Sequence, residues 1–281
     1  ESDGSYYSGI IIAKEKETVH ILTTTKAIKN GSPNVVFDSG VRVSSTVVGD
    51  DTDSGLAVIQ VTTNFEVKPF TMLDTNVLAQ AANVVVMSGR NLTTGSAVIS
   101  SGITSEPGVW RMSSTTTWLS SMLEMDTPIT SIQEGGAVID LNGSLVGVVA
   151  SQPYQGNSRM EYAITANEIK LIYNAIKTNG KVVRGALGVV VRNVSSMLAY
   201  EKSAHGISID MKTGLYVQTV VEKIDTEDGL QEGDIITMID GIEMSSYQDV
   251  LARLYMHSAG DTVNVSIIRG GESKQIGVVL Q

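Results

Sequence analysis

The chain has 281 residues, a formal net charge of −10 and no cysteine. Its length is sufficient for two domains with separate cores, and its apolar content of 42% is that of a globular protein. The acidic surface makes nucleic acid and a bare anionic membrane poor partners and favours a basic or unfolded peptide. The lack of cysteine excludes a disulfide framework, a thiol nucleophile and a zinc–thiolate site, and no other residues have metal-ligand spacing, so no metal or cofactor is expected.

The first part of the chain is predicted to consist mainly of β-strands. Short apolar runs separated by turn residues are typical of a barrel or sandwich, and they lie at residues 9–13, 19–24, 34–37, 56–61, 83–87, 97–103, 135–139 and 144–150. Asn142-Gly143, between the last two runs, is typical of a hairpin turn. All five prolines, both tryptophans and all three phenylalanines precede residue 155, which indicates that the rest of the chain is a differently built unit.

One helix is predicted where these two parts meet. Thr165 and Glu168 have the spacing of a capping box, apolar residues then follow with helical periodicity, and Gly180 is placed to end the helix. The helix and the short charged segment after it form a natural boundary. We therefore expect domains at residues 1–180 and 181–281.

The second part alternates strands and helices, which predicts an α+β domain. Strands are expected at 186–191, 214–221, 234–239, 262–269 and 274–280, and helices at 226–230 and 247–257. Asp240-Gly241 and Gly270-Gly271 are typical of tight turns between strands. The second of these helices has one apolar face, which is formed by Val250, Leu251, Leu254 and Tyr255.

This second part resembles a PDZ domain of the HtrA (DegP-like) family of proteases. The stretch GLQEGDII at 229–236, followed by IDG at 239–241, is similar to the family signature, and Gly260-Asp261 and RGG at 269–271 also match. The resemblance implies that an extended peptide is added as a strand to a sheet edge, while a tight loop takes the carboxylate at the end of the peptide. By motif position, the peptide-binding residues are Ala186, Leu187, Gly188, Val189, Val191, Val250, Leu251 and Leu254.

The first part resembles the trypsin-like protease domain of the same family. The matching stretches are SGIII at 8–12, ILTTTKAI at 21–28, LAVIQV at 56–61, SSGITS at 100–105, DTPITSIQEGGA at 126–137 and NGSLVGV at 142–148. The resemblance implies a mainly β protein: a chymotrypsin-like double β-barrel followed by a PDZ-type α+β domain.

The positions that would carry catalysis depart from the family pattern. Hydrolysis by this fold needs a serine nucleophile, a histidine base and an aspartate that orients the histidine. Lys26 stands where the histidine belongs, Gly55 where the aspartate belongs, and Glu134 where the serine belongs. Ile132 stands where a glycine supports the oxyanion hole, and a β-branched residue strongly disfavours a positive φ there.

These changes predict a pseudoprotease, which is not an enzyme and binds peptides or unfolded segments. We expect an ion pair between Lys26 and Glu134 at the vestigial site, because the base and nucleophile positions face each other in this fold. Two alternatives remain. One is an active protease in which Lys26 activates Ser131, and the other is a structural module at the cell surface.

The resemblance also suggests partners and a location. Relatives assemble as trimers through the protease domain, so a homotrimer or a mixed assembly that regulates active relatives is expected, with Tyr6 and Tyr7 as contact candidates. The expected location is extracytoplasmic, in protein quality control. No apolar run reaches the ~18–20 residues of a membrane span, so any membrane anchor is expected upstream of Glu1.

Overall fold

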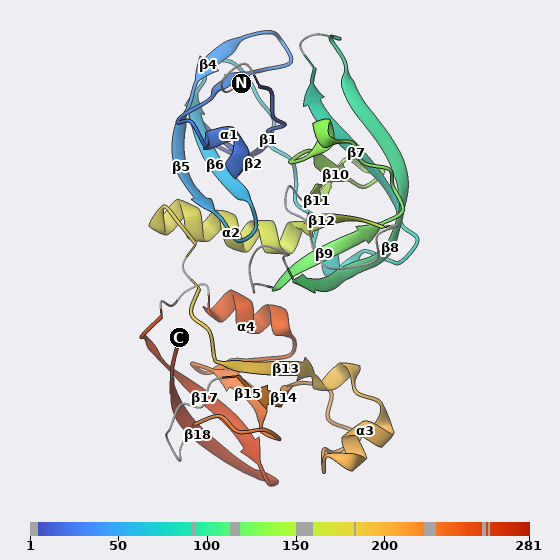
Figure 1. Ribbon diagram of the computed structural model, residues 1–281, viewed down its shortest axis with the longest axis vertical. Coiled ribbons are helices and arrows are strands. Elements are labelled where there is room, and N and C mark those ends of the chain that lie inside the picture. Colours follow the sequence, from blue (N-terminus) through green and yellow to red (C-terminus); the bar gives the residue numbers. More distant parts are fainter. Residues whose placement is uncertain are drawn as a thin grey trace. The chain divides into compact units, whose positions relative to one another are not determined.

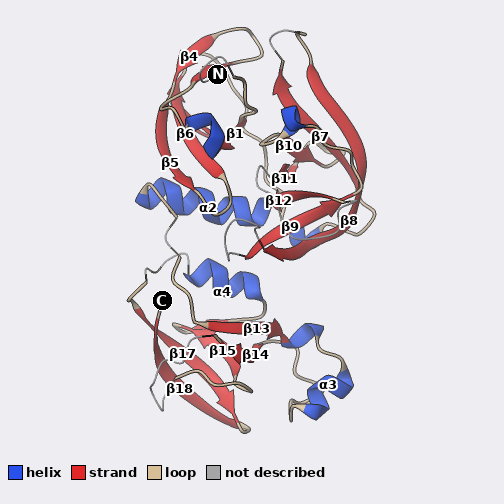
Figure 2. Cartoon of the chain, viewed as in Figure 1, coloured by secondary structure: helices blue, strands red, loops and turns tan. Residues whose placement is uncertain are grey.

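The computed structural model divides the chain into two compact units, Glu1–Val182 and Val183–Gln281. Both units are built mainly from antiparallel strands, as predicted (Figure 1). Figure 2 shows how few helices accompany these strands. The residues that the structure describes are 5–91, 94–112, 119–149, 160–182, 184–221, 229–254, 257 and 259–281.

The first half of the first unit is an open sheet with a separate ribbon. The sheet has the order β1-β2-β6-β5, and β3 pairs with β4. The strands are β1 (Ile10–Glu15), β2 (Thr18–Thr24), β3 (Asn34–Val36), β4 (Arg42–Ser44), β5 (Thr46–Asp51) and β6 (Leu56–Thr62). Val19 and Ile21 on β2 lie opposite Val61 and Ile59 on β6, and all four are buried in one cluster. The two-residue period of a strand therefore places these apolar side chains on one face.

The second half of the first unit is a closed barrel. Its order is β10-β11-β12-β9-β8-β7, and β10 pairs back to β7 to close it. The strands are β7 (Asn83–Arg90), β8 (Ala97–Met112), β9 (Leu119–Met125), β10 (Ala137–Ile139), β11 (Leu145–Val149) and β12 (Glu161–Thr165). Two short 3-10 turns, η1 (Thr75–Val77) and η2 (Ser131–Gln133), lie in its connections. Closure leaves the barrel without a free edge.

Helix α2 (Ala166–Asn179) follows the barrel and has the ends that the sequence predicts. The Thr165 side chain accepts a hydrogen bond from the Glu168 N–H at 3.3 Å, and Gly180 ends the helix with φ 72°. The helix lies against β5 so closely that a Cβ on Gly49 would come within 1.9 Å of the Gly180 carbonyl oxygen. Only glycine therefore fits at position 49.

Two polar contacts join α2 to the open sheet. His20 Nδ1 on β2 lies 2.6 Å from the Tyr173 hydroxyl on α2. Lys177, one turn further along α2, forms an ion pair with Glu15 on β1. Burial lowers the pKa of His20 below its usual range, because removal from water disfavours the charged imidazolium.

The second unit is a single sheet with helices at its edge. Its order is β13-β14-β15-β17-β18, and β16 pairs with β15. The elements are β13 (Val189–Asn193), η3 (Val194–Ser196), α3 (Ala199–Ala204), β14 (Leu215–Val220), β15 (Ile235–Ile239), β16 (Ile242–Glu243), α4 (Tyr247–Leu254), β17 (Thr262–Arg269) and β18 (Glu272–Val279). Gly270 and Gly271 turn the last hairpin with φ of 59° and 86°, which suits the predicted tight turn.

The structure differs from the predicted elements in several places. The strand predicted at 186–191 begins only at Val189, because Ala186 pairs with Gln281 instead and Gly188 has a positive φ of 67°. The helix predicted at 247–257 is α4, which ends at Leu254, and the helix predicted at 226–230 lies mostly outside the described residues.

The sequence patterns also missed β4, β5, β9, β12 and α3. Strand β4 has only three residues, β9 has no β-branched residue, and β5 ends in Gly49-Asp50-Asp51, which are residue types depleted in strands. Within the described residues, no helix is both long and apolar enough to cross a membrane.

The burial of His20 predicts an acid sensitivity of folding. The unfolded chain binds a proton at His20 more tightly than the folded chain does, so the free energy of unfolding is expected to fall as pH drops below about 6.5, the usual pKa of histidine. Urea unfolding at pH 7.5 and 5.0 measures the loss. His20→Gln should lose less than the wild type over this interval, and an equal loss would show that His20 contributes nothing.

Candidate functional site

Lys26 and Glu134 meet where the two halves of the first unit come together. Lys26 lies on α1 (Thr25–Ile28), the short helix directly after β2, and Glu134 is the residue directly after η2. Lys26 Nζ donates a hydrogen bond to Glu134 Oε2 at 2.5 Å. The expected ion pair is therefore present. Both side chains remain accessible, with 50% of the Lys26 side chain and 34% of the Glu134 side chain exposed.

Gly55 lies beside this pair but supplies only backbone. Its carbonyl oxygen accepts a hydrogen bond from the Thr25 N–H at 2.8 Å, which fixes the start of α1, and its φ of 74° suits glycine. The nearby carboxylate of Asp51 is buried and accepts a hydrogen bond from the Ser54 N–H at 3.3 Å, so it holds the turn. The three expected positions thus lie together, as an ammonium, a carboxylate and a backbone carbonyl.

The loop before Glu134 is held by one buried side chain, Gln133. Its Oε1 accepts hydrogen bonds from the Thr130 N–H at 3.0 Å and from the Thr130 hydroxyl at 3.1 Å. Its Nε2 donates to the Ser100 hydroxyl at 3.0 Å and to the Val86 carbonyl at 3.4 Å. These bonds fix η2 against the barrel, so the loop that leads to Glu134 has a defined shape.

The backbone N–H of Glu134 points back into the 3-10 turn η2. The N–H of Glu134 donates to the Ser131 carbonyl oxygen at 3.3 Å, as the 3-10 turn requires. Ile132 lies inside this turn and is not among the positive-φ residues of the described chain. In this geometry the amide at position 134 is occupied, whereas an oxyanion hole needs its donors aimed at the reacting carbonyl.

Gly135 and Gly136 are required by packing alone. A Cβ on Gly135 would come within 2.5 Å of the Thr24 methyl group, and Gly135 has a φ of 70°. A Cβ on Gly136 would come within 2.4 Å of the Met87 carbonyl oxygen. The glycine pair therefore lets the loop approach β2 and β7 closely, whatever residue precedes it.

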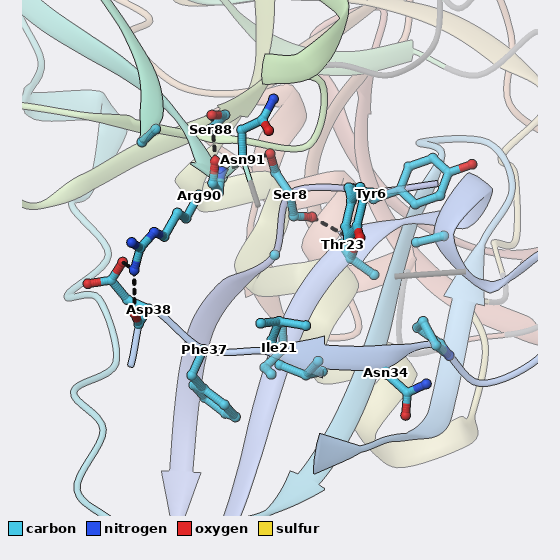
Figure 3. Close-up of a pocket in the computed structure, with 18 of the residues that line it drawn as sticks. Tyr6, Ser8, Ile21, Thr23, Asn34, Phe37, Asp38, Ser88, Arg90 and Asn91 are labelled. Carbon is cyan, nitrogen blue, oxygen red and sulfur yellow. Dashed lines mark hydrogen bonds and ion pairs between the residues drawn. The ribbon is translucent and has the colours of Figure 1, made fainter. Parts of the chain in front are cut away.

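A pocket of about 720 Å³ opens near the Lys26–Glu134 pair. Figure 3 shows it between the open sheet and the end of β7. Ala27 and Ile132, which flank the pair in sequence, both line it. Its remaining walls combine an apolar floor with a polar rim. They include Ile11, Ile21, Phe37, Tyr6, Arg90 and Asn91.

Ser8 and Arg90 fix the walls of this pocket. The Ser8 hydroxyl accepts from the Gly89 N–H at 3.0 Å and donates to the Ile132 carbonyl at 3.3 Å, so it joins both halves of the unit. Arg90 donates to the Asp38 carbonyl at 2.8 Å and pairs with its carboxylate at 3.6 Å. The sequence analysis missed this pocket, because its walls come from segments that are far apart in the chain.

Most of the expected peptide-binding residues of the second unit lie in one apolar cluster or pack against it. Leu187, Val250 and Leu254 are buried in one apolar cluster, and the half-buried Val189 and Val191 pack against it. Leu251 is also buried but is not part of this cluster. Strand β13, which carries Val189 and Val191, is at the edge of the sheet. The described fold therefore places an edge strand beside an apolar cluster that also includes α4.

The loop expected to take a carboxylate is partly used by the chain itself. The N–H of Ala186 donates to the Gln281 carbonyl at 3.0 Å, and the Gln281 N–H donates to the Ala186 carbonyl at 3.0 Å. The Gly188 carbonyl accepts from the Val221 N–H at 2.8 Å, and its φ is 67°. A Cβ on Gly188 would meet the Gln281 side chain at 3.0 Å. Ala186 therefore has a structural role, because it ties the segment before β13 to Gln281.

Comparison with known proteins identifies both units. Residues 7–148 match the family model of the trypsin-like peptidase domain, and residues 185–280 match the PDZ domain. The chain belongs to the trypsin-like peptidase family. It is an HtrA-like, trypsin-fold protein with a PDZ domain, and the predicted mainly β fold class is confirmed.

Similar proteins with a curated description include HtrA proteases. The chain is 27% identical over 282 residues to the serine protease Do-like HtrA of Lactobacillus helveticus, across 98% of this chain and 68% of the relative. It is 26% identical over 285 residues to the protein of the same description from Lactococcus lactis, across 97% and 70%. A serine protease HtrA-like from Staphylococcus aureus is 27% identical across 98% of this chain but only 37% of its own length.

Solved structures share the fold. An HtrA-type protease AlgW with tripeptide superposes with a TM-score of 0.66 at 20% identity, over 98% of this chain and 91% of that one. The same protease with decapeptide has a TM-score of 0.63 at 20% identity, over 97% and 81%.

The Lys26–Glu134 pair is expected to contribute little to stability. Exposed ion pairs typically contribute about 0.2–1 kcal/mol, since water and salt screen both charges. A double-mutant cycle of Lys26→Met and Glu134→Gln, followed by urea unfolding, should give a coupling energy in this range that shrinks in about 1 M salt. A coupling of several kcal/mol would show that the pair is a main support of the unit.

Proposed function

We propose that this HtrA-like protein is a catalytically silent binding protein, which holds peptides or unfolded segments and does not cleave them. The observation that carries the proposal is the ion pair of Lys26 with Glu134, at the positions of the base and the nucleophile. Neither residue supplies a hydroxyl or an imidazole, and Gly55 supplies no carboxylate. Loss of the triad typically reduces turnover about 10⁶-fold.

Two further features oppose acyl transfer at this site. The negative charge of Glu134 would repel the oxyanion of a tetrahedral intermediate, which is the reverse of the stabilisation that such sites supply. The N–H of Glu134 is directed to the Ser131 carbonyl, so it is not aimed at a bound substrate. Loss of nucleophile, base, orienting carboxylate and oxyanion donor together supports a silent site.

The alternative of a Lys26–Ser131 dyad requires a neutral lysine that accepts the serine proton. A lysine in an ion pair with a carboxylate is protonated and has no lone pair to accept that proton. The contact with Glu134 therefore favours the silent protein over the dyad.

Hydrolysis is tested with unfolded casein and a fluorophosphonate probe. We expect the wild type to show neither cleavage nor labelling. A triple variant (Lys26→His, Gly55→Asp, Glu134→Ser) restores the triad, and a quadruple variant that adds Ile132→Gly also frees the oxyanion loop. Labelling is expected to be strongest in the quadruple variant. Wild-type cleavage that disappears in Ser131→Ala or Lys26→Met would establish the dyad instead.

The PDZ domain is the proposed peptide-binding element. An extended peptide would add to the edge strand β13 and place its side chains toward Leu187, Val191 and α4. The carboxylate would be taken by the backbone around Gly188, whose positive φ turns the loop at the start of this strand. The solved AlgW structures with bound peptides, which share the fold, support this choice of ligand.

Peptide binding is tested by fluorescence anisotropy with a C-terminal peptide library. The best free-acid peptide should bind at least ~10-fold more tightly than its C-terminal amide, because a charged hydrogen bond contributes about 1.5–3 kcal/mol. Val191→Lys should reduce binding, since Val191 packs against the apolar cluster. Val190→Lys is the matched control, because the neighbouring Val190 has an exposed side chain. Equal binding of acid and amide would leave the structural surface module as the better explanation.

The pocket beside Lys26 and Glu134 offers the protease-fold unit a second contact with an unfolded segment. Its volume of about 720 Å³ and its apolar floor suit one or two large side chains. The remaining parts of the proposal rest on the family likeness. They are an extracytoplasmic location, a role in protein quality control, and a homotrimer or mixed assembly that regulates active relatives.

A further inference from the structure

Asn193 joins the edge strand of the PDZ sheet to the helix on the other side of the proposed groove. It is the last residue of β13, and its Oδ1 accepts a hydrogen bond from the N–H of Tyr247 at 2.9 Å. Tyr247 is the first residue of α4. The bond therefore connects the two elements between which a peptide would bind, directly and at one end.

Helix α4 does not need Asn193 to begin. Asp249 Oδ2 accepts hydrogen bonds from the N–H groups of Ser245 and Ser246 at 2.9 and 2.8 Å, and from the Ser246 hydroxyl at 3.1 Å. The Asp249 N–H donates to the Ser246 hydroxyl at 3.4 Å. This local cap satisfies the first turn in the usual way. The additional bond to Asn193 therefore fixes where α4 lies rather than whether it forms.

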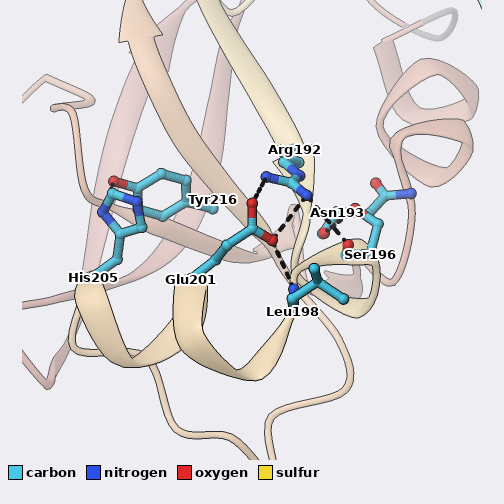
Figure 4. A network of polar contacts seen from close by, with 7 residues as sticks. All are labelled: Arg192, Asn193, Ser196, Leu198, Glu201, His205 and Tyr216. Carbon is cyan, nitrogen blue, oxygen red and sulfur yellow. Dashed lines mark hydrogen bonds and ion pairs between the residues drawn. The ribbon is translucent and has the colours of Figure 1, made fainter.

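Asn193 is itself held by a clamp that includes helix α3 (Figure 4). Its carbonyl accepts a hydrogen bond from the Ser196 hydroxyl at 2.8 Å. The adjacent Arg192 makes two bonds to the Glu201 carboxylate, at 2.9 and 3.1 Å, and Glu201 also accepts from the Leu198 N–H at 2.7 Å. The bond from Arg192 lowers the pKa of Glu201, so the carboxylate stays charged.

The far end of α4 has a separate anchor. Arg253 donates to Asp240 at 2.9 Å, and Asp240 also accepts from the Asn264 N–H at 2.8 Å. Asp240 lies in the turn between β15 and β16, away from β13 in the sheet order. If the bond to Asn193 is lost, α4 therefore keeps its distal anchor and its apolar contacts, and its first turn becomes free to move relative to β13.

We propose that Asn193, held by the Arg192–Glu201 clamp, is a positioning residue that sets the separation of β13 and α4 and thereby the size of peptide side chain that the groove accepts. The inference rests on the proposed peptide binding and adds the source of its selectivity. Helix α3, which carries Glu201, would thus act on ligand choice through Arg192 and Asn193.

The test uses the full chain and the C-terminal peptide library, with Leu-ended and Ala-ended peptides compared for each variant. Asn193→Ala removes the acceptor, and we expect it to weaken binding of the Leu-ended peptide about 3- to 10-fold and to reduce the preference for Leu over Ala. Asn193→Asp keeps Oδ1 and should restore both values to within about twofold of the wild type. Amide exchange at Tyr247 should be faster in Asn193→Ala only.

Ser246→Ala is the matched control for simple loss of stability. It weakens the local cap, so it should lower the folding equilibrium constant about fivefold while the preference for Leu over Ala stays unchanged. Asn193→Ala with the wild-type preference would overturn the positioning role and leave peptide binding intact. A wild type that binds no C-terminal peptide would instead overturn the proposed function, and this inference with it.

Discussion

The ion pair of Lys26 with Glu134 is the contact on which the proposed function depends. It brings an ammonium and a carboxylate to the place where this fold otherwise brings an imidazole and a hydroxyl. The two arrangements share a geometry, since both need two side chains from opposite halves of the unit within hydrogen-bond distance. They differ in chemistry, because neither side chain supplies the hydroxyl nucleophile or the imidazole base that this kind of hydrolysis uses.

The residues around the pair are held by packing and hydrogen bonds that do not involve the side chains of Lys26 and Glu134. Gly135 and Gly136 remain because any Cβ there would collide with β2 or β7, and Gln133 remains buried because it fixes η2 to the barrel. Ser8 joins the start of β1 to the loops of the barrel. These contacts concern packing and backbone hydrogen bonds. They constrain the loop as strongly in a silent protein as in an active one, so loop shape alone is no sign of activity.

The PDZ unit, in contrast to the protease-fold unit, retains the two elements that would contact a peptide, strand β13 and helix α4. The edge strand β13 and helix α4 share one apolar cluster. Buried residues such as Val250 and Leu254 provide the floor of that cluster, and a ligand would add to it from the open edge. Such a groove depends on the distance between a strand and a helix, which apolar packing defines only loosely and a directional hydrogen bond defines well. The bond from Tyr247 to Asn193 has this property.

The sequence by itself determined the features that depend on neighbouring residues or on residue identity. Thr165 and Gly180 predicted both ends of α2, and Gly270-Gly271 predicted a tight turn. The loss of the triad at positions 26, 55 and 134 rests on residue identity alone and stays a prediction. The tertiary structure decided the contacts between distant segments. Lys26 and Glu134 are 108 residues apart, and Ala186 pairs with Gln281 at the end of the chain. Such contacts follow from how strands pair and barrels close, which local patterns do not encode.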